Sequence, residues 1–275
     1  MKKDLSSLWS PDELTRKKSK LESFCRILDR KKLLKYSPEF KNLWKWSVNK
    51  PEIFWSEIWD FTKVKGVKGK KIIKKNKTFY KTLFFPNSKL NYAENQLSKN
   101  NEEIAIKFLS EKNIEKKITW KKLRENVCRF SHFLNELNLK EKDRIAAYVP
   151  NTIETIIAFL ATSKNGLIWS SCSPDFGEQG LVDRFFQIKP KVLITCDYYF
   201  YNGKKINIIE KIPSILKKIK SIRKIIVFPY SDKFTKKINP KYIDFYSVIK
   251  SSPIDNTFKK FDFNHPLYIL YSSGT

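Results

Sequence analysis

The sequence predicts a layered α/β fold with a mostly parallel sheet, preceded by a small helical unit. From about residue 103 onward, apolar stretches of strand length alternate with stretches of helical periodicity, and short loops join them, which is the order that β-α-β units produce. The expected strands are almost entirely apolar, as strands covered on both faces should be. Before that point the apolar residues recur at helical spacing instead.

The helical unit is expected to cover residues 1–97. Four of the seven tryptophans lie in residues 36–62, where apolar side chains recur near helical spacing and predict two helices with aromatic anchors. Pro51 fits the first turn of the second helix, because proline lacks an amide hydrogen that this position does not need. Residues 63–81 are expected to form a lysine-rich connector or hairpin, and a short helix should begin near Asn91.

Residues 98–275 are expected to form the α/β part, as an incomplete version of its fold. Residues 103–109 alternate like a strand, and residues 111–113 could turn into a second strand that ends at Ile118. Thr119 is a good N-cap for the next helix. The expected helices are 120–137, 152–164, 177–188 and 208–220, and the remaining expected strands are 144–149, 167–171, 191–195, 224–228 and 267–271.

The chain of 275 residues has a formal charge of +27, which raises the question of nucleic acid or an anionic membrane as a partner. The basic residues are 47 Lys and only 8 Arg, alongside 30 Ile, 19 Asn and 6 Ala. Lys, Ile and Asn share A/T-rich codons, and Arg is the residue that favours bidentate phosphate and base contacts. Residues 142–200 contain six basic and six acidic residues. We therefore predict no nucleic-acid partner and ascribe most of the charge to solvated lysine-rich faces, with an anion-binding role as the alternative.

The N-terminal sequence lacks the apolar run of a signal peptide. The longest stretch without Asp, Glu, Lys or Arg is 263–275, which is too short to span a bilayer. The sequence has four cysteines without a C-x-x-C pair and only two histidines, so a zinc site is not expected. We predict reduced thiols in a cytoplasmic protein with no membrane partner. Cys172 has no histidine near it in sequence, so a nucleophilic role there is not favoured.

Three segments should lie at the carboxyl edge of the sheet, where ligands of such folds bind. They are 148–152, 170–177 and 271–275. In the last of them the apolar strand LYILY runs directly into Ser272, Ser273, Gly274 and Thr275. Hydroxyl groups and backbone N–H groups directly after a buried strand can form a phosphate-binding loop, and glycine lets the backbone approach the phosphate oxygens. An ordinary turn is the alternative.

Several ordered blocks resemble the acyl-adenylate-forming enzymes, the superfamily of acyl-CoA synthetases, luciferases and adenylation domains. LYILYSSGT resembles the start of their nucleotide-binding signature, which continues there as Thr-Gly-x-Pro-Lys, and FFPNSKLNYAENQL resembles an opening block of the acetyl-CoA synthetase-like members. IWSSCSPDFG, LVDRFFQIKPKVLIT and HPLYILYSSGT most resemble the acetoacetate–CoA ligases of that superfamily. The resemblance extends from about Leu8 to Thr275.

The resemblance implies two half-reactions that use ATP with Mg²⁺ and then CoA, with acetoacetate as the acid. It implies that Ser272, Ser273, Gly274 and Thr275 bind the ATP phosphates. It also places Gly203, Lys204 and Lys205 where related enzymes hold the nucleotide end of CoA with an Arg-x-Gly-Arg-type segment. Here Lys replaces one Arg and Tyr201 the other, which loses bidentate geometry. A solvated lysine pair in a loop is the alternative.

No catalytic or metal-binding residue is expected within this chain, because the corresponding family positions lie beyond Thr275. We expect the chain to be an N-terminal piece that is inactive alone and needs the C-terminal portion of the same enzyme. A short-chain acyl-CoA synthetase for acetate or propionate, and a non-catalytic nucleotide-binding or interaction module, are the alternatives. Asp175 and Glu178 are more simply helix-start carboxylates, His265 a structural residue before Pro266, and His132 a surface residue.

Overall fold

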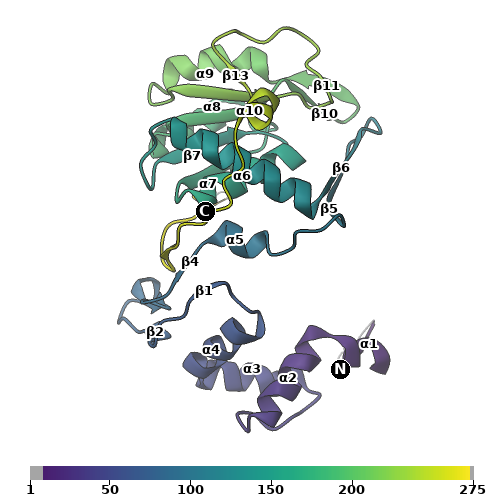
Figure 1. The fold of residues 1–275 in the computed structure, drawn as a ribbon, viewed down its shortest axis with the longest axis vertical. Helices are drawn as coiled ribbons and strands as arrows, with labels where there is room; N and C mark the ends of the chain where they lie inside the picture. The colour runs from purple at the N-terminus through teal and green to yellow at the C-terminus, as the bar shows by residue number, and fades with distance from the viewer. Residues whose placement is uncertain (1–8, 273–275) are drawn as a thin grey trace, which may run out of the picture. The chain divides into compact units, whose positions relative to one another are not determined.

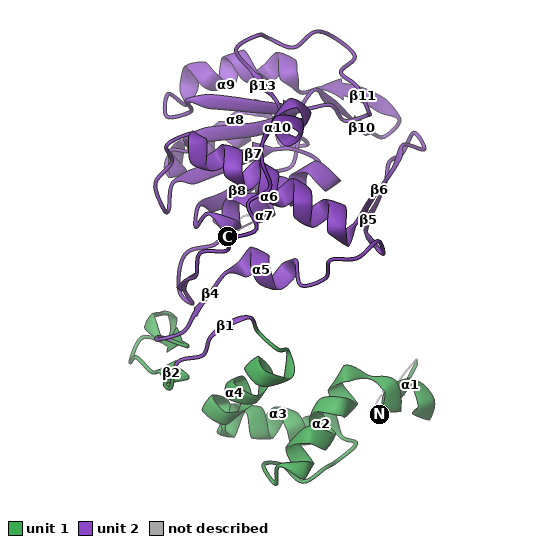
Figure 2. Ribbon diagram, in the orientation of Figure 1, with its two compact units in different colours: residues 1–64, 70–85 green, residues 65–69, 86–275 purple. Residues whose placement is uncertain are grey.

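The computed structural model describes residues 9–272, which divide into two compact units (Figure 2). Unit 1 comprises the chain up to residue 64 together with residues 70–85, and unit 2 comprises residues 65–69 and everything from residue 86 onward. Each unit has its own buried apolar cluster. The chain therefore passes from one unit to the other more than once, between residues 64 and 86.

Unit 1 is built on helices with aromatic contacts. Its elements are α1 (Glu13–Lys18), α2 (Lys20–Arg30), α3 (Phe40–Asn49), α4 (Pro51–Phe61), β2 (Ile73–Lys74), the 3₁₀ turn η1 (Phe79–Lys81) and β3 (Leu83–Phe84). Phe24 is buried, and its ring lies 6.2 Å from that of Phe54 and 5.0 Å from that of Phe61. Pro51 stands in the first turn of α4, so the predicted helix pair and its proline start are confirmed.

The core of unit 2 is a five-stranded, fully parallel sheet (Figure 1). Its spatial order is β13 (Ile243–Asp244), β12 (Lys224–Phe228), β9 (Val192–Cys196), β7 (Arg144–Tyr148) and β8 (Ile168–Cys172). Every residue of β9 is buried, as are all but the first residues of β7 and β12. This burial explains the continuous apolar runs in the sequence, since such strands have no solvent-facing side.

Helices of unit 2 pack in two groups. One group contains α5 (Tyr92–Gln96), α6 (Trp120–Glu136), α7 (Ile153–Lys164) and α10 (Phe245–Ser251), and the other contains α8 (Glu178–Ile188) and α9 (Ile212–Lys218). Helix α7 connects β7 to β8, whereas α8 leads back past β7 to β9. Because such crossovers are right-handed, connections in opposite directions cover opposite faces of the sheet. The predicted α/β class with a parallel sheet is thereby confirmed.

Antiparallel pieces surround this sheet. They are β1 (Gly66–Val67), β4 (Lys89–Leu90) and β14 (Phe261–Asp262) in one small sheet, the hairpin of β5 (Ile104–Leu109) and β6 (Glu115–Thr119), and the hairpin of β10 (Tyr198–Tyr201) and β11 (Lys204–Asn207). The predicted turn after residue 110 is confirmed, with Asn113 at a φ of 54°. Thr119 caps α6, accepting a hydrogen bond from the backbone of Lys122.

Two predicted elements are wrong in part. The helix expected over 208–220 is split into a 3₁₀ turn η2 (Ile209–Lys211) and α9, whose first turn contains Pro213. Proline favours the start of a helix over its interior, which explains the break. The strand expected over 267–271 is reduced to an isolated parallel bridge between Tyr268 and Trp169. Among residues 9–272, no helix has the length and apolar character needed to cross a bilayer.

Candidate functional site

The carboxyl ends of the parallel strands define one edge of the sheet of unit 2, called here the carboxyl edge. β7 ends at Tyr148, β8 at Cys172 and β9 at Cys196. The segment 267–271 runs parallel to β8 on its open side, so its end lies at the same edge. The three segments predicted to lie at this edge, which begin at 148, 170 and 271, therefore do so as far as the described residues reach.

Three hydrogen bonds hold the segment 267–271 against β8. The backbone N–H of Trp169 donates to the carbonyl of Leu267 at 3.1 Å, and the N–H of Ile269 donates to the carbonyl of Trp169 at 2.8 Å. The Ser170 hydroxyl donates to the Ile269 carbonyl at 3.0 Å. Ser170 is buried. Ser170 thus helps to hold the segment that leads to the expected phosphate loop.

The loop between β8 and α8 is tied to neighbouring strands by tyrosines. The buried Tyr148 hydroxyl lies 3.0 Å from the carbonyl oxygen of Pro174 and 2.9 Å from that of Phe176. Burial raises the pKa of Tyr148 to about 12. The Tyr199 hydroxyl donates to Asp175 at 2.8 Å, and burial, followed by this hydrogen bond, raises the pKa of Tyr199. Both hydroxyls therefore stay protonated and act as fixed donors.

Arg184 of α8 lies between two aromatic rings at this edge. Its guanidinium carbon is 4.2 Å from the centre of the Phe176 ring and 5.8 Å from that of Tyr271. The Tyr271 hydroxyl donates to the carbonyl oxygen of Arg184 at 2.6 Å. Cation–π contacts of this kind stabilise an arginine against apolar surroundings. The stack joins the β8–α8 loop to the residue directly before Ser272.

The carboxyl edge also contains a buried ion pair. Glu154, in the first turn of α7, is 1% exposed and lies 2.9 Å from the Lys116 ammonium of β6. The Tyr246 hydroxyl donates to the same carboxylate oxygen, and the pKa of Tyr246 is raised, first by burial and then by the Glu154 charge. A buried carboxylate requires such partners, because desolvation of an unpaired charge is costly. The cluster joins β6, α7 and α10.

Of the four residues predicted to bind ATP phosphates, Ser272 is exposed at the carboxyl edge. Ser273, Gly274 and Thr275 lie outside the described residues. The segment beside β8 places Ser272 at the edge where ligands of this fold class bind, and its role in phosphate binding stays a prediction.

The residues predicted to bind CoA lie at the tip of the β10–β11 hairpin, with Gly203 in its turn and the two lysines at the start of β11. Asn202 and Gly203 both have positive φ, at 48° and 72°. An Asn-Gly pair between two strands is a strong hairpin signal, so the pattern YYFY-NG-KKIN could have predicted this element. Lys204 and Lys205 begin β11, and the Lys205 ammonium lies 3.9 Å from the centre of the Tyr198 ring.

The segment predicted to bind CoA and the segment predicted to bind the ATP phosphates both lie at the carboxyl edge. The strands that lead to them are not neighbours. The hairpin follows β9, whereas Ser272 follows the segment beside β8, with β7 between β9 and β8. Three strand spacings of about 4.8 Å separate the two starting points by roughly 14 Å. Only an extended ligand could reach both.

A contact absent from the sequence prediction links this hairpin to the turn of the β5–β6 hairpin. The backbone N–H of Asn202 donates to Glu111 Oε1 at 3.0 Å, and the N–H of Gly203 donates to Glu111 Oε2 at 2.8 Å. Glu111 and Gly203 are 92 positions apart. No sequence pattern in a single chain indicates such a pairing.

Other side chains discussed in the sequence analysis have structural partners. Glu178 lies in the first turn of α8, where it accepts a hydrogen bond from Ser214 at 2.6 Å and pairs with Lys218 at 2.8 Å. These contacts lower the pKa of Glu178, the Lys218 hydrogen bond most. Cys172 is buried, and burial raises its pKa, which disfavours a thiolate nucleophile. His132 is partly exposed and lies 3.5 Å from Glu136.

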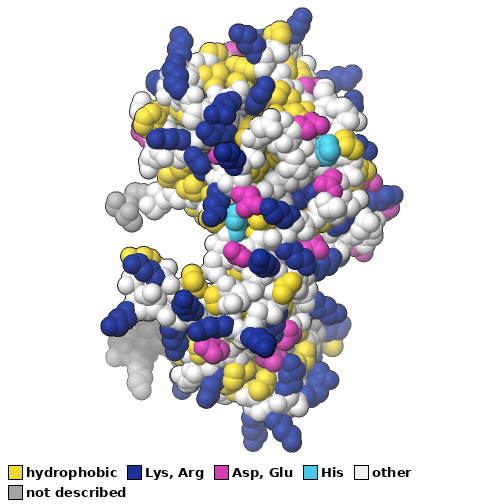
Figure 3. Space-filling view, turned by 60° about the vertical axis from the view of Figure 1, so that its left-hand side comes forward, with side chains coloured by type: hydrophobic (Ala, Val, Ile, Leu, Met, Phe, Trp, Pro, Cys, Tyr) yellow, Lys and Arg dark blue, Asp and Glu magenta, His cyan; other side chains and the backbone are white. Residues whose placement is uncertain are grey.

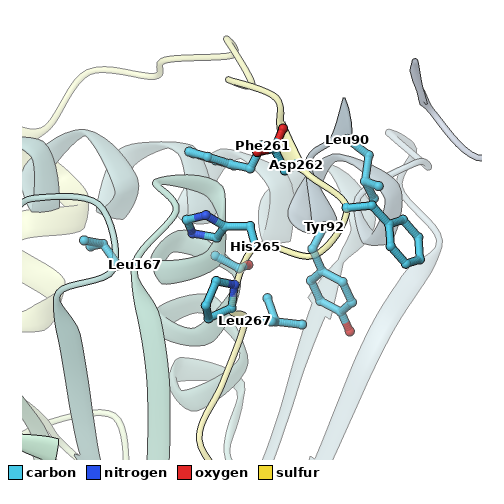
Figure 4. Close-up of a pocket in the computed structure, with 10 residues that line it drawn as sticks. Leu90, Tyr92, Leu167, Phe261, Asp262, His265 and Leu267 are labelled. Carbon is cyan, nitrogen blue, oxygen red and sulfur yellow. The ribbon is translucent and has the colours of Figure 1, made fainter. Parts of the chain in front are cut away.

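A cavity lies at the opposite, amino edge of the sheet (Figure 4). It has a volume of about 190 Å³, and Leu90, Tyr92, Phe261 and Leu267 contribute apolar walls. His265 also lines it, with Nε2 at 2.8 Å from the carbonyl oxygen of Gly166 and its ring stacked 4.9 Å from Phe261. This histidine therefore has the structural contacts expected of it. Within residues 9–272, no group of three or more His, Cys, Asp or Glu residues is arranged to hold a metal ion.

Comparisons with known proteins agree with this frame. The family model described as AMP-binding enzyme matches residues 93–275. A curated acetoacetyl-coenzyme A synthetase of Rhizobium meliloti (strain 1021) is 39% identical over 235 residues, covering 84% of this chain and 36% of that protein. An acetoacetyl-CoA synthetase of Xenopus tropicalis is 36% identical over 282 residues, covering 98% of this chain and 41% of that protein.

A solved structure is also similar. It is an acetoacetyl-CoA synthetase from Streptomyces lividans, with a TM-score of 0.89 and 27% identity over 97% of this chain and 41% of that chain. This chain thus spans only about two fifths of the length of the relatives it matches.

Proposed function

The chain belongs to the AMP-binding enzyme family, and from this premise we propose that it provides the phosphate-binding frame of an acetoacetate–CoA ligase. The observation that carries the proposal is the segment 267–272, which runs parallel to β8 and places Ser272 at the carboxyl edge. The names of the most similar relatives support acetoacetate as the acid.

The proposed reaction has two steps. A carboxylate oxygen of acetoacetate attacks the α-phosphorus of ATP, and pyrophosphate leaves with the electrons of the broken P–O bond. The thiolate of CoA then attacks the acyl carbon, and AMP leaves as acetoacetyl-CoA forms. Both steps depend on holding the reactants in line and on stabilising the phosphate charge. A loop of Ser272, Ser273, Gly274 and Thr275 would supply hydroxyl and backbone donors for the phosphates.

Residues Gly203, Lys204 and Lys205 are proposed to contact the nucleotide end of CoA. Their separation from Ser272 by three strand spacings suits CoA, whose thiol is far from its nucleotide. Lysine ammonium groups would meet the phosphate charge without the bidentate geometry of arginine. Mg²⁺ would enter with ATP, and because no cluster of acidic ligands is present within residues 9–272, we assign it no step.

We also propose an AMP-binding subdomain over 98–275, a helical domain over 1–97 and a cytoplasmic location. The family match begins at residue 93, near the proposed boundary. All four cysteines are free thiols, which fits a reducing compartment. A ligase for acetate or propionate is the second candidate.

The test is pyrophosphate release by the full product of the gene that encodes this chain, with ATP, CoA and each of acetoacetate, acetate and propionate. We expect the highest kcat/KM with acetoacetate. Ser272→Ala should lower kcat/KM, and Ser251→Ala, an exposed serine on α10, serves as the matched control with unchanged activity. Release with acetate or propionate at higher kcat/KM would replace acetoacetate, and no release with any acid would favour a non-catalytic module.

A further inference from the structure

The turn of the β10–β11 hairpin already binds an anion, and that anion is the chain's own Glu111. Each carboxylate oxygen accepts one backbone hydrogen bond, from Asn202 at 3.0 Å and from Gly203 at 2.8 Å. Two consecutive N–H groups that converge on one anion form the kind of concave backbone site that also binds phosphate. The positive φ values of both residues produce this convergence.

The surroundings of the turn favour negative charge. Lys204 and Lys205 follow it directly, and Lys112 is the neighbour of Glu111. The Lys205 ammonium is held by the Tyr198 ring at 3.9 Å and lies 3.4 Å from Thr235 Oγ1. Within residues 9–272, no ion pair joins Glu111 to a lysine. The hydrogen bonds of this carboxylate are therefore to the turn.

The same turn is open on its outer side. A Cβ atom added to Gly203 would meet no atom within 4 Å, and Glu111, Asn202 and Gly203 are all exposed. A ligand can approach these N–H groups from solvent. Because each N–H has one hydrogen to donate, a phosphate group and the Glu111 carboxylate cannot both be bound at full strength.

We propose that Glu111 is a displaceable internal occupant of a phosphomonoester site formed by Asn202, Gly203, Lys204 and Lys205. This inference rests on the proposed function, in which that phosphomonoester is the 3′-phosphate of CoA. A dianionic phosphate displaces the carboxylate because it makes stronger charge-assisted hydrogen bonds and also meets the two lysines. A ligand with a single carboxylate makes the same hydrogen bonds as Glu111. It therefore does not displace Glu111 from the turn. Glu111 thus sets the selectivity of the site for phosphate.

The test is a titration of the 275-residue chain with adenosine 3′,5′-bisphosphate, followed by NMR through the amide signals of Asn202 and Gly203. We expect Glu111→Ala to bind the bisphosphate about tenfold more tightly than the original chain, since the competing charged acceptor is gone. Glu115→Ala is the matched control, because it removes a nearby exposed carboxylate that pairs with Lys107 and Lys117 instead of the turn. It should bind as the original chain does.

A second variant, Lys205→Gln, should weaken binding of the bisphosphate in the Glu111→Ala background. The inference is overturned if Glu111→Ala binds no more tightly than the original chain, or if the Asn202 and Gly203 signals do not move in any variant. A comparison of CoA with dephospho-CoA separates the two proposals. Tighter bisphosphate binding by Glu111→Ala without a preference for CoA supports the internal occupant and contradicts the assignment of CoA.

Discussion

Asp197 shows how a single buried carboxylate organises the end of a strand. It follows β9, and its Oδ1 accepts hydrogen bonds from the backbone N–H groups of Tyr198 and Tyr230, both at 2.9 Å. Its own carbonyl accepts hydrogen bonds from Ile208 and Ile209. Burial raises the pKa of Asp197 even though these hydrogen bonds act in the opposite direction. The backbone hydrogen bonds to the Asp197 carboxylate thus do not fully offset the cost of burying its charge.

The raised pKa of Asp197 predicts a pH dependence of stability. The folded state holds the proton more tightly than the unfolded state, so this group favours folding at pH values below its ordinary value of 3.8. That contribution is lost as pH rises through the higher pKa of the folded state. We expect the free energy of unfolding of the original chain, minus that of Asp197→Asn, to fall as the pH rises above the ordinary pKa of this group.

Urea unfolding at several pH values measures this difference. Asp183→Asn, which changes an exposed carboxylate on α8, is measured beside it as the surface control. A difference for Asp197→Asn that rises with pH would show that the folded state favours the ionised form, contrary to the burial of this group.

At the scale of elements, Gly166 determines how α7 is joined to β8. Its φ is 68°, and its carbonyl oxygen accepts a hydrogen bond from the Lys142 backbone at 2.9 Å and lies 2.8 Å from His265 Nε2. A Cβ atom at this position would lie 2.4 Å from the nearest atom of the Phe261 ring. The connection therefore requires glycine both for its backbone conformation and for its close contact with an aromatic ring.

Gly166→Ala should accordingly destabilise unit 2. A positive φ costs alanine about 1 kcal/mol, and the steric conflict with a buried ring adds roughly 1–3 kcal/mol. Thermal unfolding, followed by the near-ultraviolet signal of Trp169 and its neighbours, measures the loss. Gly177→Ala is the matched control, because Gly177 has a φ of −60° and a Cβ atom there meets nothing within 4 Å. Equal stability of the two variants would contradict this account.

The elements that the sequence predicted well are those whose signals are local. The strand Lys224–Phe228 was predicted with its observed bounds, and Thr119 and Pro51 stand at the helix starts expected of them. The β10–β11 hairpin is not among the expected elements, although the Asn-Gly pair at 202–203 is a local signal for its turn. The contact of Glu111 with Gly203 could not be predicted, since it depends on the tertiary placement of two turns.

The segment 267–271 shows a different limit of sequence-based prediction. Its apolar pattern predicted a strand, yet the structure contains a single bridge at Tyr268. A regular strand requires a continuous ladder of hydrogen bonds with a neighbour, and here the backbone of the segment bonds to the backbone of Trp169 and to the Ser170 side chain. The apolar pattern predicted where the segment lies and in which direction it runs. It did not predict that the hydrogen bonding would be irregular. That direction is what the candidate phosphate site depends on.

The charge of +27 is a property of the whole molecule. On the face shown in Figure 3, lysine and arginine side chains are spread over the surface with acidic side chains between them. Several lysines pair with carboxylates, as Lys218 does with Glu178 and Lys259 with Glu141. Binding of duplex DNA requires many phosphate contacts at once, and a specific binder also requires side chains that read base edges. The dispersed lysines of this face provide the first only weakly and are not suited to the second.

This distribution predicts how the chain responds to salt in the presence of DNA. At low salt it should bind duplex DNA by counterion release. Raising the salt to about 0.15 M should weaken binding and raise the dissociation constant to micromolar or above. Fluorescence anisotropy with two labelled duplexes of equal length and unrelated sequence measures both effects, and the two duplexes should bind alike. Nanomolar binding at 0.15 M salt with a preference for one duplex would mean that the lysines form a recognition surface. In that case the charge would be part of the function.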